Sequence, residues 1–445
     1  MSLPRYPDHR DSDAAWLGPV PAHWRTRRLG FFFEERREKV SDKAYAALSV
    51  TKSGVVPQLD TAAKTDDGDN RKKVCAGDLV INSRSDRKGS SGASSLDGSV
   101  SLINTVLRPL GGVHVRFAHY LLRSVQFQEE FYRYGKGIVA DLWSTNYSEM
   151  RNIVLAMPDL DEQREIAGFL DRETAKINAL IAEQENLVTL LAEKRQATIY
   201  HLVTSGKNHN ASTKNSGVTW LGDVPAHWKV GKAGFYVSVL PGYAFSSSEF
   251  SLDDKCVRLL RGINVGVGEL RWDEVVYWQR TTGDGLDAFE LQVGDVVIGM
   301  DRPLISSGIR VALVNQDDLP CLLLQRVAKV SPGSSLDPKF VMRLLGSRAF
   351  EAHFAPETTG VSVPHLSGEQ ISNFVIPIPP ADEQRQICDF IDAELDRLDA
   401  LNREAGIAIG LLKERRSALI SAAVTGQIDV RGVVPQSSAP EELAA

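Results

Sequence analysis

Two long stretches of the chain carry apolar residues that return every three or four positions. They cover residues 159–204 and 380–425, and this spacing predicts two long amphipathic helices. The first stretch would span roughly 69 Å at about 1.5 Å per residue. The expected apolar stripes consist of Ile166, Leu170, Ile177, Leu180, Leu187 and Leu191 in the first helix, and of Ile387, Ile391, Leu398, Leu401, Leu412 and Leu419 in the second.

Both helices open with the same motif. Asp161–Leu180 reads DEQREIAGFLDRETAKINAL and Asp382–Leu401 reads DEQRQICDFIDAELDRLDAL, with 10 of 20 positions identical at an offset of 221. A second motif is also repeated, since Trp16–Trp24 is WLGPVPAHW and Trp220–Trp228 is WLGDVPAHW, with 8 of 9 identical at an offset of 204. The chain therefore holds two copies of one unit. The bodies between the motifs differ in sequence, which suggests a common frame with two separate recognition surfaces.

In both bodies short apolar runs alternate with turn residues, a pattern typical of strands. The Trp-Pro openings are expected to be extended segments whose indole rings pack on the following body. The other expected elements are strands at 46–50, 79–82 and 100–107 and a helix at 117–134 in the first body, and strands at 296–298, 311–314 and 322–330 in the second.

These elements predict an α+β chain with two globular mixed α/β bodies and an internal pseudo-twofold repeat. Matching stripes most simply pair with each other, so we expect the two helices to form an antiparallel coiled coil. The alternative is that each helix packs separately on its own body. The expected divisions are a first body at 1–158 with a frayed start at 1–15, a helix at 159–206, a polar linker at 207–219, a second body at 220–379, a helix at 380–426 and a disordered tail at 427–445.

The composition is that of an ordinary globular protein. Hydrophobic residues make up 43% of the 445 residues and charged residues 24%. No apolar run approaches the roughly 18 residues that cross a bilayer, and no signal peptide is visible. The four cysteines are scattered, which favours reduced thiols in a cytoplasmic protein over disulfides or a metal site.

The net charge of −6 is divided unevenly along the chain. Residues 25–158 carry 21 Lys and Arg against 15 Asp and Glu, whereas residues 229–379 carry 14 against 17. The two helical stretches are acidic as well. Because charge is segregated by domain, the acidic total does not exclude a nucleic-acid partner for the basic first body.

No catalytic constellation can be recognised. The sequence has no Walker phosphate loop, no dinucleotide-binding glycine motif and no histidines at metal-ligand spacing. We therefore predict no catalytic residue and no metal site.

Polar loops in both bodies combine arginine, lysine and small residues, the types that contact bases and phosphates in DNA complexes. A solvated surface loop is at least as good an interpretation of each. The candidate DNA-binding residues are Lys52, Arg71, Lys72, Lys73, Arg84, Arg87, Lys88 and Ser90 in the first body, and Arg258, Arg261, Asn264, Arg302, Arg310 and Arg326 in the second.

The doubled Trp-Leu-Gly-x-Val-Pro-x-His-Trp opening and the doubled Pro-x-x-Asp-Glu-Gln-Arg helix start closely resemble the specificity subunit of type I restriction-modification systems. The resemblance extends from Trp16 to about Asp429. It implies that each body is a target recognition domain that reads one half of a split, asymmetric DNA site, and that the coiled coil sets the gap between the halves.

The resemblance also implies a chain that is not itself catalytic and binds no cofactor. Two modification subunits would bring S-adenosylmethionine and methylate adenine, and restriction subunits with ATP and Mg could join them. The acidic second body departs from the basic face expected of such a domain. Two other functions are compatible with the residues: a stand-alone bipartite DNA-binding regulator and, ranked last, a nuclease that acts alone.

Overall fold

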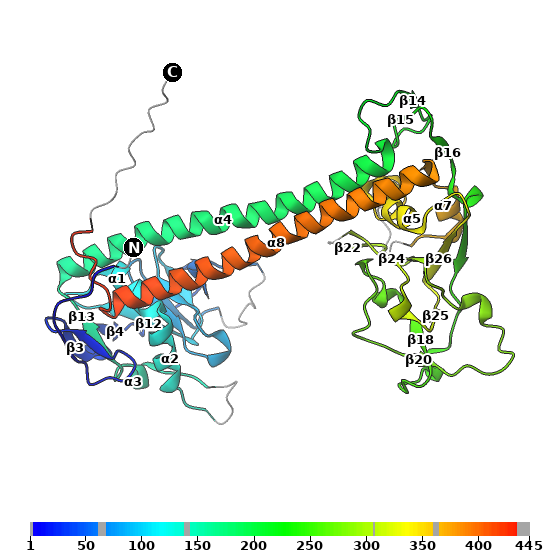
Figure 1. The fold of residues 1–445 in the computed structure, drawn as a ribbon. Helices are drawn as coiled ribbons and strands as arrows, with labels where there is room; N and C mark the ends of the chain where they lie inside the picture. Colours follow the sequence, from blue (N-terminus) through cyan, green and yellow to red (C-terminus); the bar gives the residue numbers. More distant parts are fainter. Residues whose placement is uncertain (1–2, 61–67, 138–142, 306–307, 359–364, 434–445) are drawn as a thin grey trace, which may run out of the picture. The chain divides into compact units, whose positions relative to one another are not determined.

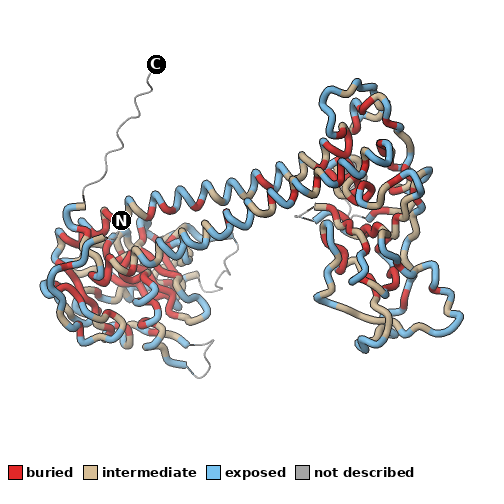
Figure 2. Tube along the Cα trace, viewed as in Figure 1, coloured by how far each residue is buried: buried red, intermediate tan, exposed pale blue. Residues whose placement is uncertain are grey.

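The computed structural model describes residues 3–60, 68–137, 143–305, 308–358 and 365–433 (Figure 1). The chain divides into two compact units. The first unit is built from residues 1–185 and 407–445, and the second from residues 186–406. Buried residues gather inside the body of each unit (Figure 2).

The two predicted long helices are present, as α4 (Leu160–Ser205) and α8 (Ala381–Val424). Asp159 caps α4, because its Oδ1 accepts hydrogen bonds from the backbone N–H groups of Asp161, at 3.1 Å, and Glu162, at 2.9 Å. Gly206 and Gly426 follow the helix ends, each with a φ of +73°, a backbone conformation that favours glycine. The first helix therefore ends within one residue of its predicted bound at 206.

In the first unit, a four-stranded antiparallel sheet in the order β10-β9-β12-β4 lies beside a three-stranded sheet in the order β11-β8-β5. Its other strands form the pairs β1–β2, β6–β7 and β13–β3. The elements are β1 (His9–Asp11), β2 (Pro19–Pro21), β3 (Arg25–Arg28), β4 (Phe33–Glu35), β5 (Lys39–Val40), β6 (Leu48–Thr51), β7 (Gly54–Pro57), β8 (Arg71–Val74), β9 (Leu79–Asn82), β10 (Ser91–Ala93), β11 (Gly98–Val100), β12 (Asn104–Pro109), β13 (Val154–Met157), α1 (Val115–Arg123), α2 (Val125–Arg133) and α3 (Tyr147–Met150).

In the second unit, a five-stranded sheet in the order β17-β26-β21-β24-β19 lies beside a three-stranded sheet in the order β20-β18-β25. The remaining pairs are β14–β15, β16–β27 and β22–β23. The elements are β14 (Thr213–Asn215), β15 (Asp223–Pro225), β16 (Lys229–Lys232), β17 (Val237–Pro241), β18 (Val257–Leu260), β19 (Val267–Gly268), β20 (Tyr277–Trp278), β21 (Val296–Gly299), β22 (Leu304–Ile305), β23 (Gly308–Ile309), β24 (Val311–Leu313), β25 (Cys321–Leu323), β26 (Val327–Pro332), β27 (Val375–Ile378), α5 (Pro338–Leu345), α6 (Arg348–Thr358) and α7 (Gly368–Asn373).

Three predicted elements are each divided in two. The helix expected at 117–134 is α1 followed by α2, because Ser124 has an extended backbone and its hydroxyl accepts a hydrogen bond from the Phe127 N–H. The strand expected at 100–107 is the end of β11 followed by β12, and the strand expected at 322–330 is β25 followed by β26. Apolar periodicity alone does not register such short interruptions.

Both long helices contribute to the core of each unit. In the first unit Leu170 of α4 and Val424 of α8 are buried in the same cluster as Trp24. In the second, Ile199 of α4 and Ile391 of α8 share a cluster with Trp228. The alternative in which each helix packs only on its own body is therefore wrong.

Seven of the twelve predicted stripe residues are buried: Ile166, Leu170, Ile177, Leu191, Ile387, Ile391 and Leu398. Leu412 and Leu419 are half-buried. The prediction is wrong for Leu180, Leu187 and Leu401, which are 46%, 38% and 39% exposed. The structure instead buries Ile181 and Ala405. Leu180 lies one position before the buried Ile181, and since successive residues lie about 100° apart around a helix, this places Leu180 towards solvent.

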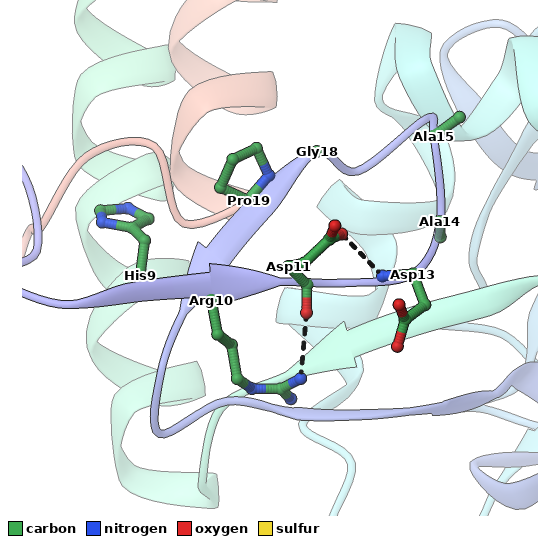
Figure 3. Close-up of a pocket in the computed structure, with 8 residues that line it drawn as sticks. All are labelled: His9, Arg10, Asp11, Asp13, Ala14, Ala15, Gly18 and Pro19. Carbon is green, nitrogen blue, oxygen red and sulfur yellow. Dashed lines mark hydrogen bonds between the residues drawn. The ribbon is translucent and has the colours of Figure 1, made fainter.

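The two ends of the described chain meet within the first unit. Tyr6 and Val430 are both buried, and the Asp429 N–H donates to the Pro4 carbonyl at 2.8 Å. In Figure 3, His9 points towards the segment after α8, and its Nε2 lies 3.3 Å from the Gly426 carbonyl oxygen. The predictions of a frayed start and a disordered tail are therefore wrong for residues 3–15 and 427–433, since both segments pack. Residues 434–445 lie outside the described residues.

The expected linker at 207–219 also contains structure. Its strand β14 pairs with β15 in the same register that β1 has with β2, at an offset of 204. A run of small polar residues can form such an edge pair, so composition alone misplaced the boundary.

Candidate nucleic-acid interface

The two repeated motifs bind each other, and this contact mounts each body on its helix. In the first unit the carboxylate of Glu162 accepts hydrogen bonds from the Trp24 indole at 3.1 Å and the Tyr6 hydroxyl at 2.6 Å, and lies 2.8 Å from His23. In the second unit Glu383 accepts from the Trp228 indole at 3.0 Å and lies 2.8 Å from His227. Burial and the hydrogen bond to Glu162 raise the pKa of Tyr6 well above its usual range.

The glutamine next in each motif fixes the loop before a body helix. Gln163 accepts from the His114 N–H at 2.7 Å and donates to the Gly112 carbonyl at 3.0 Å. Gln384 makes the matching bonds in the second unit, from the Asp337 N–H at 2.7 Å and to the Ser335 carbonyl at 2.9 Å. The repeated motifs therefore attach each body to its long helix. We expect the ligand contacts to come from the parts of the bodies that differ in sequence.

The first body has a polar cleft of about 730 Å³ between the β6–β7 hairpin and the loop that follows β9. Five of the predicted site residues line it: Lys52, Arg71, Arg84, Arg87 and Ser90. Residues from three separate parts of the sequence therefore meet at one place. Positive and small polar side chains in a cleft of this kind suit a DNA strand.

Two arginines in this cleft are free to reach a ligand. Arg84 precedes the short 3-10 helix η2 (Ser85–Arg87), and its backbone N–H donates to Asn82 Oδ1 at 3.1 Å. Asp86 lies 3.3 Å from Arg84 and 3.6 Å from Arg87, and all three side chains are at least 41% exposed. Exposed ion pairs of this kind contribute roughly 0–1 kcal/mol, so a base or a phosphate can replace Asp86 at little cost.

Four other predicted residues already have partners in the protein. Buried Arg71 donates to Ser99, at 2.9 Å to the hydroxyl and 3.1 Å to the carbonyl, and burial lowers its pKa. Lys72 pairs with Glu35 at 3.2 Å, Lys73 with Glu38 at 2.9 Å, and Lys88 with Glu129 at 2.5 Å. Of these four, Arg71 alone lines the cleft. Lys88 and Glu129 are 49% and 61% exposed, so a ligand can replace that ion pair as easily as those of Asp86.

The cleft also contains polar residues outside the set of candidate DNA-binding residues, namely Gln58, Asn82, Ser101 and Asn104. Asn104 Oδ1 is buried without a hydrogen-bond partner among the described residues. Asparagine and glutamine are the side chains that read adenine edges. Their place at strand ends beside the basic loop is the signal that could have identified them.

In the second body Arg258, Arg261 and Asn264 hold the backbone together. Arg258 donates to the carbonyls of Asp317 and Leu319 at 2.9 and 3.0 Å, Arg261 donates to the Glu274 carbonyl at 2.9 Å, and buried Asn264 donates to the carbonyls of Arg271 and Glu274. Arg310 likewise donates to the carbonyls of Val265 and Asp301, and burial lowers its pKa.

Arg302 and Arg326 are the exposed members of the second set. Both have a positive φ, 45° and 70°, so the backbone turns sharply at each. Arg326 lies 2.9 Å from Asp301, which also lies 2.6 Å from His365. This smaller polar group follows β21, as the first cleft follows β9.

Nowhere in the described ranges do three or more His, Cys, Asp or Glu side chains gather as a metal site would require. None of the helices assigned there has both the length and the apolar composition that a bilayer crossing needs.

Comparison with known proteins gives consistent matches. A family model described as the type I restriction modification DNA specificity domain matches residues 277–409. The chain is 24% identical to the type I restriction enzyme MjaVIII specificity subunit of Methanocaldococcus jannaschii over 423 residues, which covers 93% of this chain and 95% of that protein.

Two solved structures share the fold. A chain from a structure of a type I restriction-modification system superposes with a TM-score of 0.63 at 18% identity, over 91% of this chain and 98% of its own length. The HsdS subunit from Thermoanaerobacter tengcongensis gives a TM-score of 0.52 at 19% identity, over 92% and 98%. The similarity therefore includes both units and both long helices.

Proposed function

We propose that the chain is a specificity subunit of a type I restriction-modification system and that each of its two bodies reads one half of a split, asymmetric DNA site. The observation that carries the proposal is a contrast between the two units. The hydrogen bonds that join each body to its long helix are the same in both units, whereas the polar surfaces of the two bodies differ. Two different half-sites require two bodies that are attached to the helices in the same way but carry different DNA-contacting residues. The similarity to specificity subunits does not favour a stand-alone regulator.

We further propose that α4 and α8 pair as an antiparallel coiled coil whose length sets the spacer of the DNA site. Support comes from contacts inside each unit. In the first, Arg416 of α8 donates to Asn178 of α4 at 2.5 Å. In the second, Arg195 of α4 pairs with Asp399 of α8. Two readers joined by a stiff connection gain affinity through effective concentration when the spacing of their sites fits.

We propose that methylation and cleavage are supplied by partner subunits in the cytoplasm. Two modification subunits would bring S-adenosylmethionine, and two restriction subunits would bring the ATP- and Mg-dependent activity of a complete complex. The chain itself would contribute no catalytic group and bind no cofactor.

The test is the pattern of methylated adenines. The chain is expressed with a modification subunit encoded beside it, and modified adenines are mapped over the host genome by single-molecule sequencing. We expect a split, asymmetric motif that disappears when this chain is deleted. A stable, soluble complex without such a motif would contradict the proposal.

A further inference from the structure

The first unit has a second cavity, of about 790 Å³, where the turn after β6 and helix α1 face α4 and the end of α8. It is lined by five cationic side chains, from Lys52, Arg116, Arg123, Lys413 and Arg416. Asp171 is the one carboxylate in its lining, and it is occupied by Arg116 and by the Tyr120 hydroxyl at 2.6 Å. The cavity is strongly positive.

Three of these cations lack a carboxylate partner among the described residues: Lys52, Arg123 and Arg416. Arg416 donates instead to the neutral amide of Asn178. Burial and the nearby charge of Arg416 lower the pKa of Arg123, although a guanidinium stays protonated. Like charges held together without counter-charge favour the binding of an anion.

In the second unit, the residue that corresponds to Arg416 has a carboxylate partner. At the offset of 221, Arg416 corresponds to Arg195, and Asn178 corresponds to Asp399. Arg195 and Asp399 form an ion pair. The second unit therefore supplies a carboxylate where the first supplies an amide.

Arg123 has no counterpart in the second unit. Arg116 of α1 and Lys339 of α5 occupy matching places, since they pair with Asp171 and Asp392, which are related by the offset of 221. Seven residues further along, α1 ends in Arg123 and α5 is followed by Gly346. At these two positions the first unit therefore has an amide in place of a carboxylate and an arginine in place of a glycine.

A hydrogen-bond conflict marks the position of the missing acceptor. The Ala93 N–H donates to Nδ1 of His119 at 3.1 Å, so the hydrogen of the neutral ring is on Nε2. Burial, together with Arg123 and Arg116, lowers the pKa of His119 to about 4, which keeps the ring neutral. Its Nε2–H then faces Arg123 Nη1, another donor, at 3.1 Å. One oxyanion could accept from both.

We propose that this cavity binds a phosphate of the DNA backbone next to the first half-site, between Arg123 and Arg416. The source of the phosphate follows from Lys52, which lines both this cavity and the base-reading cleft. A strand whose bases enter the cleft therefore brings its backbone to the cavity. The inference rests on the proposed function, and it adds a contact that fixes position without reading sequence.

The experiment measures binding of the full complex to a target duplex and to a scrambled duplex over a range of salt concentrations. The variants are Arg123→Gln and Arg416→Gln. The matched control is Arg415→Gln, which removes the same charge from an exposed neighbouring position on α8. We expect each variant to weaken binding to both duplexes by a similar factor, about tenfold, and to reduce the slope of log K against log salt by about 1.

The outcomes separate the two proposals. If the unmodified complex binds both duplexes equally, the proposed function fails. If it prefers its target but Arg416→Gln, with an unchanged Tm, keeps the full salt slope, only the phosphate site fails. A third outcome is that the Arg416→Gln complex loses its modification subunits while its DNA affinity stays unchanged. The cavity would then bind a carboxylate of a partner subunit, and this result would also overturn the phosphate site.

Discussion

An arginine can reach a ligand only if the protein has not already used its donors. The sequence grouped Arg71 with Arg84 and Arg87 because all three are basic residues in polar surroundings. The structure separates them, since Arg71 is buried and donates to Ser99, whereas Arg84 and Arg87 share one exposed aspartate. Composition predicts which residue types gather, but the available donors depend on partners distant in sequence.

We predict that Arg84→Gln combined with Arg87→Gln weakens binding to the first half-site by about thirtyfold or more. The reason is the loss of guanidinium contacts to base edges, which contribute about 1–3 kcal/mol each. The measurement is fluorescence anisotropy on duplexes that alter one half-site at a time. Arg108→Gln is the matched control, because Arg108 is equally exposed, at 54%, and pairs with Glu34 outside the cleft. Unchanged binding by the double variant would remove this loop from the interface.

At the level of elements, the sequence predicted both long helices within two residues, but only a minority of the strands of the two bodies. Strong periodicity over 44 or more residues leaves little ambiguity. The breaks at Ser124 and between β25 and β26 were missed, because a cap or a turn of one to three residues changes the apolar pattern very little. The contact between the Trp-Pro motif and the helix start could not be predicted either, since it joins positions 138 residues apart.

The contact between these motifs predicts a stability difference between two matched variants. Glu162→Ala leaves the buried Tyr6 hydroxyl and the Trp24 indole without their acceptor, and each such donor costs about 1–3 kcal/mol. Glu383→Ala should cost less, because Glu383 is 23% exposed against 5% for Glu162 and accepts from one indole. The measurement is denaturant unfolding with hydrogen exchange to distinguish the units. Equal losses in both variants would contradict this account.

Contacts between each body helix and its long helix predict how stability depends on pH. Burial opposes the charge of Asp171, but hydrogen bonds from Arg116 and Tyr120 outweigh it, so the pKa of Asp171 is lowered. Burial likewise opposes the charge of Asp392, but hydrogen bonds from Lys339 and Arg343 outweigh it, so the pKa of Asp392 is lowered too. An aspartate whose pKa is lower in the folded state than in the unfolded chain stabilises the fold at pH values above its unfolded-state pKa of about 3.9. This stabilisation is lost as the pH falls through the folded-state pKa.

We therefore expect Asp171→Asn to lower the Tm at pH 7, and the difference from the unmodified chain to shrink as the pH falls below about 4. Asp392→Asn should behave alike in the second unit. The measurement is calorimetry at a series of pH values. A difference that stays constant down to pH 3 would show that the charge of this aspartate does not stabilise the contact.

For the whole molecule, the sequence predicts two recognition surfaces, because each repeat of the two motifs is followed or preceded by one body. It cannot predict what each surface binds, because the bodies differ where the contacts lie. The described cores show why the frame tolerates this divergence. Each body packs on apolar residues from both α4 and α8. The same Trp, Glu and Gln contacts fix the first body to α4 and the second to α8. A body can therefore change its loops without changing its mounting.

If the helices set the spacer, their length must appear in the methylated motif. Deleting four residues from α4 and four from α8 shortens each by about 6 Å and turns it by about 400°, which nearly preserves the stripe. We expect the preferred gap to shorten by about two base pairs, at about 3.4 Å per base pair. Deleting two residues from each helix is the control, because a turn of about 200° exposes the stripe and should prevent folding. A folded four-residue variant whose methylated motif keeps its original gap would show that the helices join the bodies without measuring the distance between them.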